Sequence, residues 1–395
     1  MELLPPSIDD PDMLGLLGEI LSVGAPASSR LALRLRMMSP DFSWRALVAL
    51  ASQQGVIIPM VHALRRDGLL LPVRPSASPA ERDSHVTTQL EQAYCEHLAR
   101  RDDLAEQMRT IIAALNAAGI APLLLKGCRH LVAPMTPWCE ARTMRDLDLC
   151  VPPDRLDEAV RILDSLGYLP IEDGTPFDHH APAMARPGRH GAVEIHADAL
   201  ALGGRKVLAT SEVWRLCERV STPDGAFHVL PAHWHLLHGL LHHQVAERGH
   251  QRRILALKGL LEFASLGAAM SPEQWQEIAD HMTARGQAVA LGSWLYQAHA
   301  LFGLMPPAGG LVDQAARDHA AATVARAGQP YGRRRVGFIV DQIRHAFSRE
   351  MLAHRYRIEP GDVSAGTALR QAVSLCGRYG FGIVARVAGR RDRAS

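Results

Sequence analysis

Arg142-Thr-Met-Arg-Asp-Leu-Asp-Leu-Cys-Val151 is the stretch of the sequence that decides the fold. Two carboxylates, Asp146 and Asp148, stand two residues apart and alternate with apolar side chains. Side chains on a β-strand alternate between its faces, so residues i and i+2 point the same way. The pattern predicts a strand whose two acids project from one face at its entrance, while Leu147 and Leu149 pack into the core behind.

The spacing of the two acids also predicts a chemistry. Adjacent carboxylates repel each other unless a cation or a shared proton neutralises them. Hard divalent ions such as Mg²⁺ prefer oxygen ligands, which are usually one or two carboxylates together with substrate phosphates. Asp146 and Asp148 are therefore candidate ligands of Mg²⁺ or Mn²⁺. Such pairs are also common on solvated surfaces, so the neighbouring segments decide between the two interpretations.

An apolar run upstream, Leu123–Leu125, indicates a short strand that leads into Lys126 and Gly127, and a short helix is expected over residues 128–133. Gly127 has no Cβ and can adopt positive φ, which allows the backbone to approach a ligand closely. A helix N-terminus attracts phosphate, and Lys126 adds a positive charge beside it. The segment is a candidate phosphate-binding turn, although taken alone a lysine and a glycine more often end an edge strand.

Downstream, Ala192–His196 alternates in the same way as the central stretch. A strand here would place Val193 and Ile195 on one face and Glu194 with His196 on the other. Glu194 is therefore a candidate third carboxylate for the same cation.

These segments, in this order, resemble the nucleotidyltransferase superfamily with the DNA polymerase beta-like fold. They resemble more closely a bacterial family of uncharacterised nucleotidyltransferases. That family's pattern is an apolar strand into Lys-Gly, an Arg before Asp-x-Asp, a helix ending in Leu-Gly-Tyr or Leu-Gly-Phe, and an acid-x-His strand. The segments of this chain that carry the resemblance are Leu123–Gly127, Arg142, Asp146–Leu149, Leu166–Tyr168 and Glu194–His196. The resemblance covers residues 40 to 260.

Two positions depart from the better-known members of the superfamily. Those members carry Gly-Ser where this chain has Lys126 and Gly127, a replacement that is normal in the closer family. The third acid is often Asp in the superfamily and is Glu194 here. Its longer side chain changes how a second metal ion would be held.

The resemblance implies an enzyme that moves an NMP from an NTP, such as ATP, to a hydroxyl acceptor and releases pyrophosphate. It implies that Asp146, Asp148 and Glu194 are the catalytic residues and the ligands of the Mg²⁺ or Mn²⁺ cofactor. The acceptor stays open between a protein or peptide, a small molecule and RNA, and a tailoring role in peptide or natural-product synthesis is one option.

The nucleotide site implied by the resemblance contains Lys126, Gly127, Arg142 and His196. The triphosphate would lie over Lys126 and Gly127. Arg142 would either orient the loop before the strand or contact phosphate, and the sequence does not separate these roles.

Two alternatives remain open at this stage. One is a catalytically weak nucleotide-binding or scaffold protein on the same fold. The other is a metal-dependent hydrolase built on a histidine-rich helix, in which His238 and His242 lie four residues apart and share a face. The helix lacks the His-Glu-x-x-His arrangement that pairs ligands with a general base, which favours a packed or substrate-facing helix. Its histidines are His233, His235, His238, His242 and His243.

The 395-residue chain is long enough for two or three structural units. Residues 1–115 show helical periodicity, and residues 116–215 alternate strand and helix. The helical pattern returns at Ser211, and residues 216–395 are expected to form a C-terminal helical region. We predict an α+β fold: a small mixed β-sheet nucleotidyltransferase core flanked by N- and C-terminal helical regions. Asp154 is expected to cap a helix that Gly167 ends. The N-terminal helices are expected at Met13–Val23, Trp44–Gln54, Val61–Arg66 and Ser84–Leu115, with a break at Pro72–Pro79.

Composition narrows the class of protein. The formal net charge is +2, which gives no bulk attraction to nucleic acid, and the basic runs Arg333–Arg335 and Arg390–Arg393 are more typical of solvated surface. No apolar run approaches the length of about 18 residues that spans a membrane, and the acidic start is unlike a signal peptide. The six cysteines show no Cys-x-x-Cys spacing. These observations predict a cytoplasmic protein with no membrane partner.

Overall fold

The computed structural model describes residues 11–22, 27–39, 41–70, 80–171, 179–307, 310–329, 331–356 and 358–374. The chain divides into two compact units at residue 330, and the larger, N-terminal unit contains the sheet. Glu2, Asp9 and Asp10 of the acidic start, the Pro72–Pro79 break and Arg390–Arg393 lie outside the described residues.

The centre of the larger unit is a seven-stranded sheet in the order β3-β4-β5-β2-β1-β7-β6. The central strand β2 pairs antiparallel with β1 and parallel with β5, and β1 pairs parallel with β7, so the sheet is mixed. The strands are β1 Leu123–Leu124, β2 Asp146–Cys150, β3 Leu169–Pro170, β4 Met184–Ala185, β5 Ala192–His196, β6 Glu218–Thr222 and β7 Gly225–Val229.

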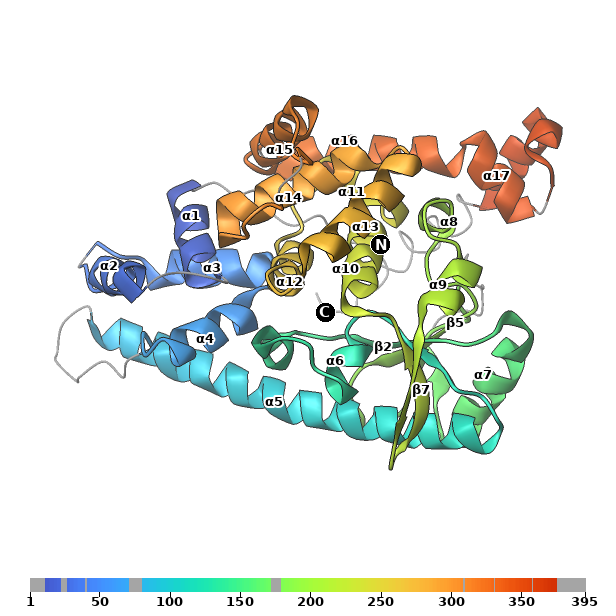
Figure 1. The fold of residues 1–395 in the computed structure, drawn as a ribbon, viewed down its shortest axis with the longest axis horizontal. Helices are drawn as coiled ribbons and strands as arrows, with labels where there is room; N and C mark the ends of the chain where they lie inside the picture. Colours follow the sequence, from blue (N-terminus) through green and yellow to red (C-terminus); the bar gives the residue numbers. More distant parts are fainter. Residues whose placement is uncertain are drawn as a thin grey trace, which may run out of the picture. The chain divides into compact units, whose positions relative to one another are not determined.

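One face of the sheet is buried under two helices. Leu147 and Leu149 from β2, with Val193 and Ile195 from β5, are each at most 1% exposed. They belong to an apolar cluster that also includes side chains of α5 (Ala80–Ala117) and α7 (Leu156–Ser165). Figure 1 shows the long helix α5 running beneath the sheet, with α7 beside it. Because alternate residues of β2 fill this core, Asp146 and Asp148 must face the other side.

A second apolar cluster packs on the opposite side of the sheet and includes the N-terminal segment. It is built mainly from helices. Before the sheet the helices are α1 Pro11–Ile20, α2 Ala27–Met37, α3 Trp44–Gln53 and α4 Ile57–Arg66. Short helices between the strands are α6 Cys128–Val132, α8 Leu202–Arg205 and α9 Thr210–Leu216, with 3-10 turns at Pro137–Ala141 and Pro153–Arg155.

After the sheet the chain is helical. The helices of the larger unit are α10 Ala232–Leu241, a π-helical turn η3 His242–Ala246, α11 Gly249–Arg252, α12 Leu257–Gly267, α13 Pro272–Ala284, α14 Ala288–Phe302 and α15 Gln314–Ala327. Figure 1 shows α10 and α12 on the side of the sheet opposite α5. The smaller unit contains α16 Tyr331–Ala346, α17 Arg349–Tyr356 and a 3-10 turn at Pro360–Asp362. None of the described helices has both the length and the apolar character needed to cross a lipid bilayer.

The predicted α+β class, with a small mixed sheet and helical flanks, is confirmed. The strand over Ala192–His196 has the predicted bounds, and Gly167 ends α7 in the left-handed conformation with φ of 84°. The predicted cap at Asp154 is wrong. A 3-10 turn over Pro153–Arg155 begins this segment, and α7 has no side-chain cap.

The expectation of a helical pattern from Ser211 onward, with a turn near Gly225, is wrong on either side of that turn, because Glu218–Val229 forms the hairpin of β6 and β7. The hairpin completes the sheet beside β1. A Pro-Asp-Gly turn joins its two short strands and is a signal for a hairpin. The helical periodicity of the flanking segments outweighed that signal. Helix α2 was not predicted either.

Asn116 near the end of α5 fastens this hairpin to the rest of the sheet. Its amide nitrogen donates to the carbonyl oxygens of Ile120 (3.0 Å) and Ala226 (2.9 Å), and its side-chain oxygen accepts the Ala226 N–H at 2.6 Å. The local hairpin pattern is weak, so this tertiary contact helps to fix where the turn forms.

We expect Asn116→Ala to lower the free energy of unfolding by about 1–3 kcal/mol, because the backbone groups at residue 226 lose their partners. Urea denaturation of the full chain measures the change. Arg109→Ala, at an exposed position of the same helix, is the matched control and should change the value by less than about 0.5 kcal/mol. Equal effects of the two substitutions would show that Asn116 is not a fastening residue.

Candidate active site

The parallel pairing of β2 with β5 brings the predicted acids together. Asp148 lies directly opposite Glu194, and Asp146 lies opposite Ala192. Residues opposite each other in register present their side chains on the same face of the sheet. All three carboxylates therefore occupy the face that α5 and α7 leave uncovered. Asp148 is 4% exposed, whereas Asp146 and Glu194 are half-buried.

Lys126 neutralises the most buried of these acids. Its Nζ donates to Asp148 Oδ1 at 2.8 Å. The residue follows β1 in the left-handed conformation with φ of 45°, a rare backbone state for a residue with a Cβ. The turn thus aims the ammonium back across the neighbouring strand.

His196 holds the same carboxylate from the other side. Its Nε2 lies 3.1 Å from Asp148 Oδ1 and 3.5 Å from Glu194 Oε2. The imidazole is fully buried, and its Nδ1 has no hydrogen-bond partner among the described residues. An imidazole fixed between two acids from neighbouring strands locks their relative position.

The charges of the group are strongly coupled. Burial alone would raise the pKa of Asp148, but the Lys126 ammonium and the hydrogen bond from His196 hold it well below its usual range. Burial would likewise raise the pKa of Glu194, and the bond from His196 lowers it. The pKa of Asp146 is raised, first by burial and then by repulsion from Asp148 and Glu194. The site is therefore short of positive charge on the side of Asp146.

Further histidines surround the acids. His180 Nε2 lies 3.9 Å from Glu194 Oε2, and the rings of His179 and His180 pack against His196 at centroid distances of 5.3 Å and 5.0 Å. Burial, followed by the charge of His196, lowers the pKa of His179 to about 2. Burial also lowers the pKa of His180, so the rings of His179 and His180 are neutral at pH 7.

Gly127 does not have the backbone conformation that was predicted. Its φ is −67°, and the positive φ belongs to Lys126. A Cβ at Gly127 would collide with the guanidinium of Arg142 and with the side chain of Met144. The position needs glycine so that Arg142 can pass behind the turn, and the expectation of a positive φ at Gly127 is wrong.

Arg142 passes this turn and ends at Glu262 in α12, where its Nε donates to Oε2 at 2.9 Å. Burial alone would lower the pKa of Arg142, but the Glu262 carboxylate raises it, so the pair is ionised. Of the two roles left open by the sequence, the geometry favours orientation of the loop before β2.

The histidine-rich helix does not form the metal site that the hydrolase alternative required. His238 Nε2 lies 2.8 Å from the carbonyl oxygen of Ala199, whereas His242 Nε2 pairs with Glu247 at 2.9 Å. His238 and His242 therefore point to different partners. Among the described residues, the metal-compatible groups are Asp148 with Glu194 and His196, His242 with His243 and Glu247, and His130 with His235 and Glu262.

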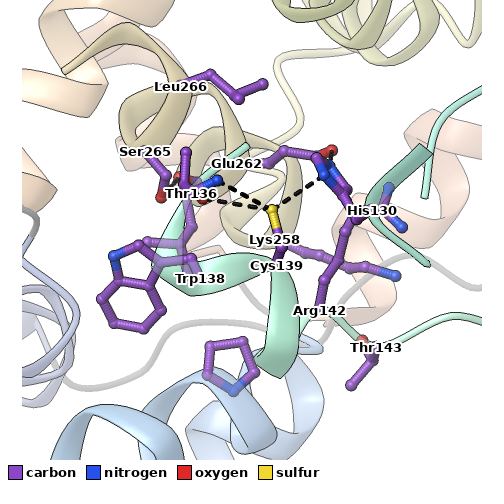
Figure 2. A pocket seen from close by; sticks show the side chains of 12 residues that line it. His130, Thr136, Trp138, Cys139, Arg142, Thr143, Lys258, Glu262, Ser265 and Leu266 are labelled. Carbon is purple, nitrogen blue, oxygen red and sulfur yellow. Dashed lines mark hydrogen bonds and ion pairs between the residues drawn. The ribbon is translucent and has the colours of Figure 1, made fainter. Parts of the chain in front are cut away.

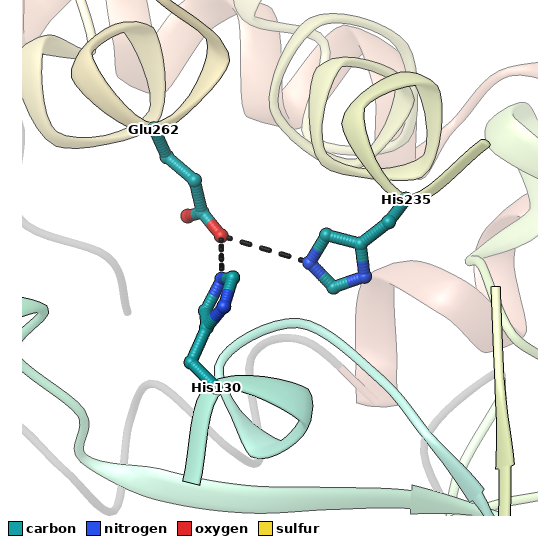
Figure 3. Close-up of side chains that lie close together, drawn as sticks. All are labelled: His130, His235 and Glu262. Atoms are coloured by element: carbon teal, nitrogen blue, oxygen red, sulfur yellow. Dashed lines mark hydrogen bonds and ion pairs between the residues drawn. The ribbon is translucent and has the colours of Figure 1, made fainter. Parts of the chain in front are cut away.

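Sequence reasoning missed the third of these groups. His130 follows the Lys-Gly turn, and Glu262 lies in an otherwise apolar helix. Figure 3 shows Glu262 between the two imidazoles: Oε1 is 3.0 Å from His130 Nε2 and 3.7 Å from His235 Nε2. The pair Lys258 and Glu262 could have pointed to this group in the sequence, because these two charges lie four residues apart on a helix that is otherwise buried.

A mixed sheet that presents three carboxylates beside a lysine turn is the arrangement expected of a nucleotidyltransferase. The model of the uncharacterised nucleotidyltransferase family matches residues 40–303, and the chain belongs to this family. It is accordingly a nucleotidyltransferase. Searches of curated proteins and of solved structures gave no match.

The ion pair between Lys126 and Asp148 can be tested by a double-mutant cycle. We expect Lys126→Met and Asp148→Asn each to destabilise the protein, because each leaves a buried partner without its counter-charge. The double variant should be more stable than the sum of the single effects predicts, with a coupling of about 1–3 kcal/mol. Chemical denaturation at neutral pH gives the four values, and additive effects would mean that the two side chains do not interact in solution.

Proposed function

We propose that the enzyme transfers a nucleoside monophosphate from an NTP to a hydroxyl acceptor, with Mg²⁺ or Mn²⁺ as cofactor and pyrophosphate as product. The observation that carries the proposal is the register of β2 and β5, which sets Asp148 opposite Glu194 with Asp146 on the same face. Lys126 stands at their side.

The side chains present fit a divalent cation. Asp148 and Glu194 each offer a carboxylate oxygen, and these oxygens lie within 4.8 Å of each other and of an imidazole nitrogen of His196. The raised pKa of Asp146, caused by burial and then by its acidic neighbours, adds a carboxylate that a cation would relieve. Hard ions such as Mg²⁺ and Mn²⁺ favour such oxygen-rich sites. A bound divalent ion would supply positive charge to the phosphates and lower the pKa of an acceptor hydroxyl.

The chain's own residues would bind and orient the substrates around this centre. Lys126, already fixed at the acids, would exchange Asp148 for the triphosphate when nucleotide and metal arrive together. His196 would keep Asp148 and Glu194 at their present separation, which fixes where the α-phosphorus has to lie. Arg142, which is paired with Glu262, would hold the loop that precedes β2 in place. Placement of this kind accounts for most of the catalysis in phosphoryl transfer.

The acceptor is the part of the reaction that the site defines least. We propose a hydroxyl on a peptide, protein or small molecule in preference to RNA. The support is the near-neutral chain with its formal net charge of +2, since RNA binding usually relies on a concentrated positive surface.

The reaction is tested by incubating the pure protein with each α-³²P-labelled NTP, Mg²⁺ and host lysate. We expect label on an acceptor, and we expect Asp148→Asn and Glu194→Gln to lower the rate by about 100-fold or more, as loss of a preorganised charge at a reacting centre does. Asp164→Asn, which removes an exposed acid of α7, is the matched control and should keep the wild-type rate. Equal rates in folded Asp148→Asn and wild-type protein would refute the site assignment, and label that is bound but never transferred would favour a scaffold function.

The metal requirement gives a separate test. Because two or three carboxylates recruit phosphate oxygens to complete the shell of a hard ion, Mn²⁺ should bind weakly to the protein alone and more tightly when a non-hydrolysable NTP is present. Electron paramagnetic resonance of free Mn²⁺ measures both affinities. An affinity that is the same with and without nucleotide, or that survives Asp148→Asn, would contradict the proposed ligand set.

A further inference from the structure

A small pocket lies next to the proposed nucleotidyl-transfer site, between the Thr136–Arg142 segment and helix α12. Trp138 and Leu266 provide apolar walls, and Lys258 and Glu262 enter from α12. Figure 2 shows Cys139 in the middle of this lining, with dashed contacts to His130 and Thr136. The reaction proposed above uses neither Cys139 nor His130.

Cys139, His130 and Glu262 form a chain of three hydrogen-bonded groups. Cys139 Sγ lies 3.0 Å from His130 Nδ1, and His130 Nε2 lies 3.0 Å from Glu262 Oε1. A nucleophile beside a base that a third group orients is the recurring arrangement of covalent catalysis, whatever the fold. Each imidazole nitrogen has a defined partner, so the ring is held in the orientation that the thiol requires.

The backbone around the sulfur also favours the thiolate. The N–H groups of Met135 and Thr136 donate to Cys139 Sγ at 3.4 Å and 3.3 Å, and Thr136 Oγ1 lies 3.5 Å away. Burial alone would raise the pKa of Cys139, but His130 and Thr136 lower it to about 7. Burial would lower the pKa of His130, whereas Cys139 and Glu262 raise it. A thiolate–imidazolium pair is therefore well populated at neutral pH.

Other described cysteines differ from Cys139. Burial raises the pKa of Cys128 well above its usual value and also raises that of Cys150. Cys95 is exposed on α5 and makes no such chain of hydrogen bonds. Selective reactivity at Cys139 would thus have a local cause, and Cys95 serves as an internal standard.

A metal ion is the competing occupant, because His130, His235 and Glu262 could hold one. Two contacts count against it. Arg142 already neutralises Glu262 through Oε2 at 2.9 Å, and Cys139 sits at the Nδ1 edge of His130, away from the Nε2 that faces Glu262. A further cation would have to bind beside a guanidinium without the thiolate as a ligand.

The positive groups around the pocket indicate the kind of substrate. Lys258 lines it with no ion-pair partner among the described residues, and Arg142, which is paired with Glu262, lies beside it. Together with the apolar wall at Trp138, this lining suits a small molecule with an apolar part next to a phosphate.

We propose that Cys139, His130 and Glu262 form a second, covalent site that accepts an acyl group from an acyl phosphate or a related acyl–phosphate anhydride. The Cys139 thiolate attacks the acyl carbon and a C–S bond forms. The C–O bond to phosphate breaks, and the phosphate leaves with the electron pair of that bond. His130 keeps its proton in this step, and Glu262 acts as a positioning residue.

Acetyl phosphate is the probe for this step. The full chain is incubated with it at pH 7, digested and analysed by peptide mass spectrometry. We expect one acetyl group on Cys139 that neutral hydroxylamine removes, as it removes a thioester, and no such group in Cys139→Ser. The readout needs no NTP, so its failure is distinguishable from failure of the nucleotidyl-transfer proposal. Absence of a hydroxylamine-sensitive acetyl group on Cys139 would overturn the acyl assignment.

Alkylation by iodoacetamide tests the activation of the thiol. At pH 7 Cys139 should react about 10-fold faster than Cys95, because the imidazolium of His130 and the N–H groups of Met135 and Thr136 favour the Cys139 thiolate. The rate should rise with pH through an inflection near 7. Apart from His130 itself, the charged or titratable groups that bear on this inflection include Arg129, Arg142, His235, Lys258 and Glu262.

Three variants separate positioning from general disturbance. His130→Gln should move the inflection up toward about 8.5, because the imidazolium partner is lost. Glu262→Gln should move it in the same direction by less. His235→Gln is the matched control, because His235 contacts Glu262 and the ring of His130 but not the sulfur, and it should leave the inflection within a few tenths of a pH unit. Equal shifts in His130→Gln and His235→Gln, or stoichiometric zinc in the purified protein, would refute the thiol site.

Discussion

The carboxylate of Asp148 is the group on which the arrangement of the larger unit depends. It is buried in the central strand, and an unpaired charge there would be prohibitively costly. Its partners come from the turn after β1 and from the end of β5. Satisfying one charge therefore ties three neighbouring strands together on the face of the sheet opposite α5 and α7. The same contacts place the other two acids and the lysine where a nucleotide and a divalent ion are proposed to bind.

Much of this geometry could be read from the sequence because it follows from the two-residue period of a strand. Alternation alone separated Leu147 and Leu149 from the acids, and it separated Val193 and Ile195 from Glu194. The local pattern is strong because one face of each strand is entirely buried. The order of the segments then indicated that these strands would meet.

The remainder depended on contacts between distant parts of the chain. The hairpin of β6 and β7 is held by Asn116, which lies 110 residues away from Ala226. The local periodicity of the sequence does not predict such a contact. The partnership of Arg142 with Glu262 spans 120 residues. It explains why Gly127 lacks a side chain, a role that the residue's own neighbours do not suggest. Such pairings are fixed by three-dimensional packing and leave only weak traces in the sequence, such as two charges on an otherwise apolar helix.

The parallel pairing of β2 with β5 has a consequence for how this family can vary. The segment between the two strands can change in length, provided that β5 returns in the same register. A slip by one residue would turn Glu194 toward α5 and α7 and bring Ile195 to the acids, because neighbouring side chains face opposite sides of the sheet. Insertions in that segment are thus tolerated only where the intervening loops absorb them before Ala192. The alternation of β5 residues between the two faces of the sheet therefore constrains sequence change here more than the identity of any one loop residue does.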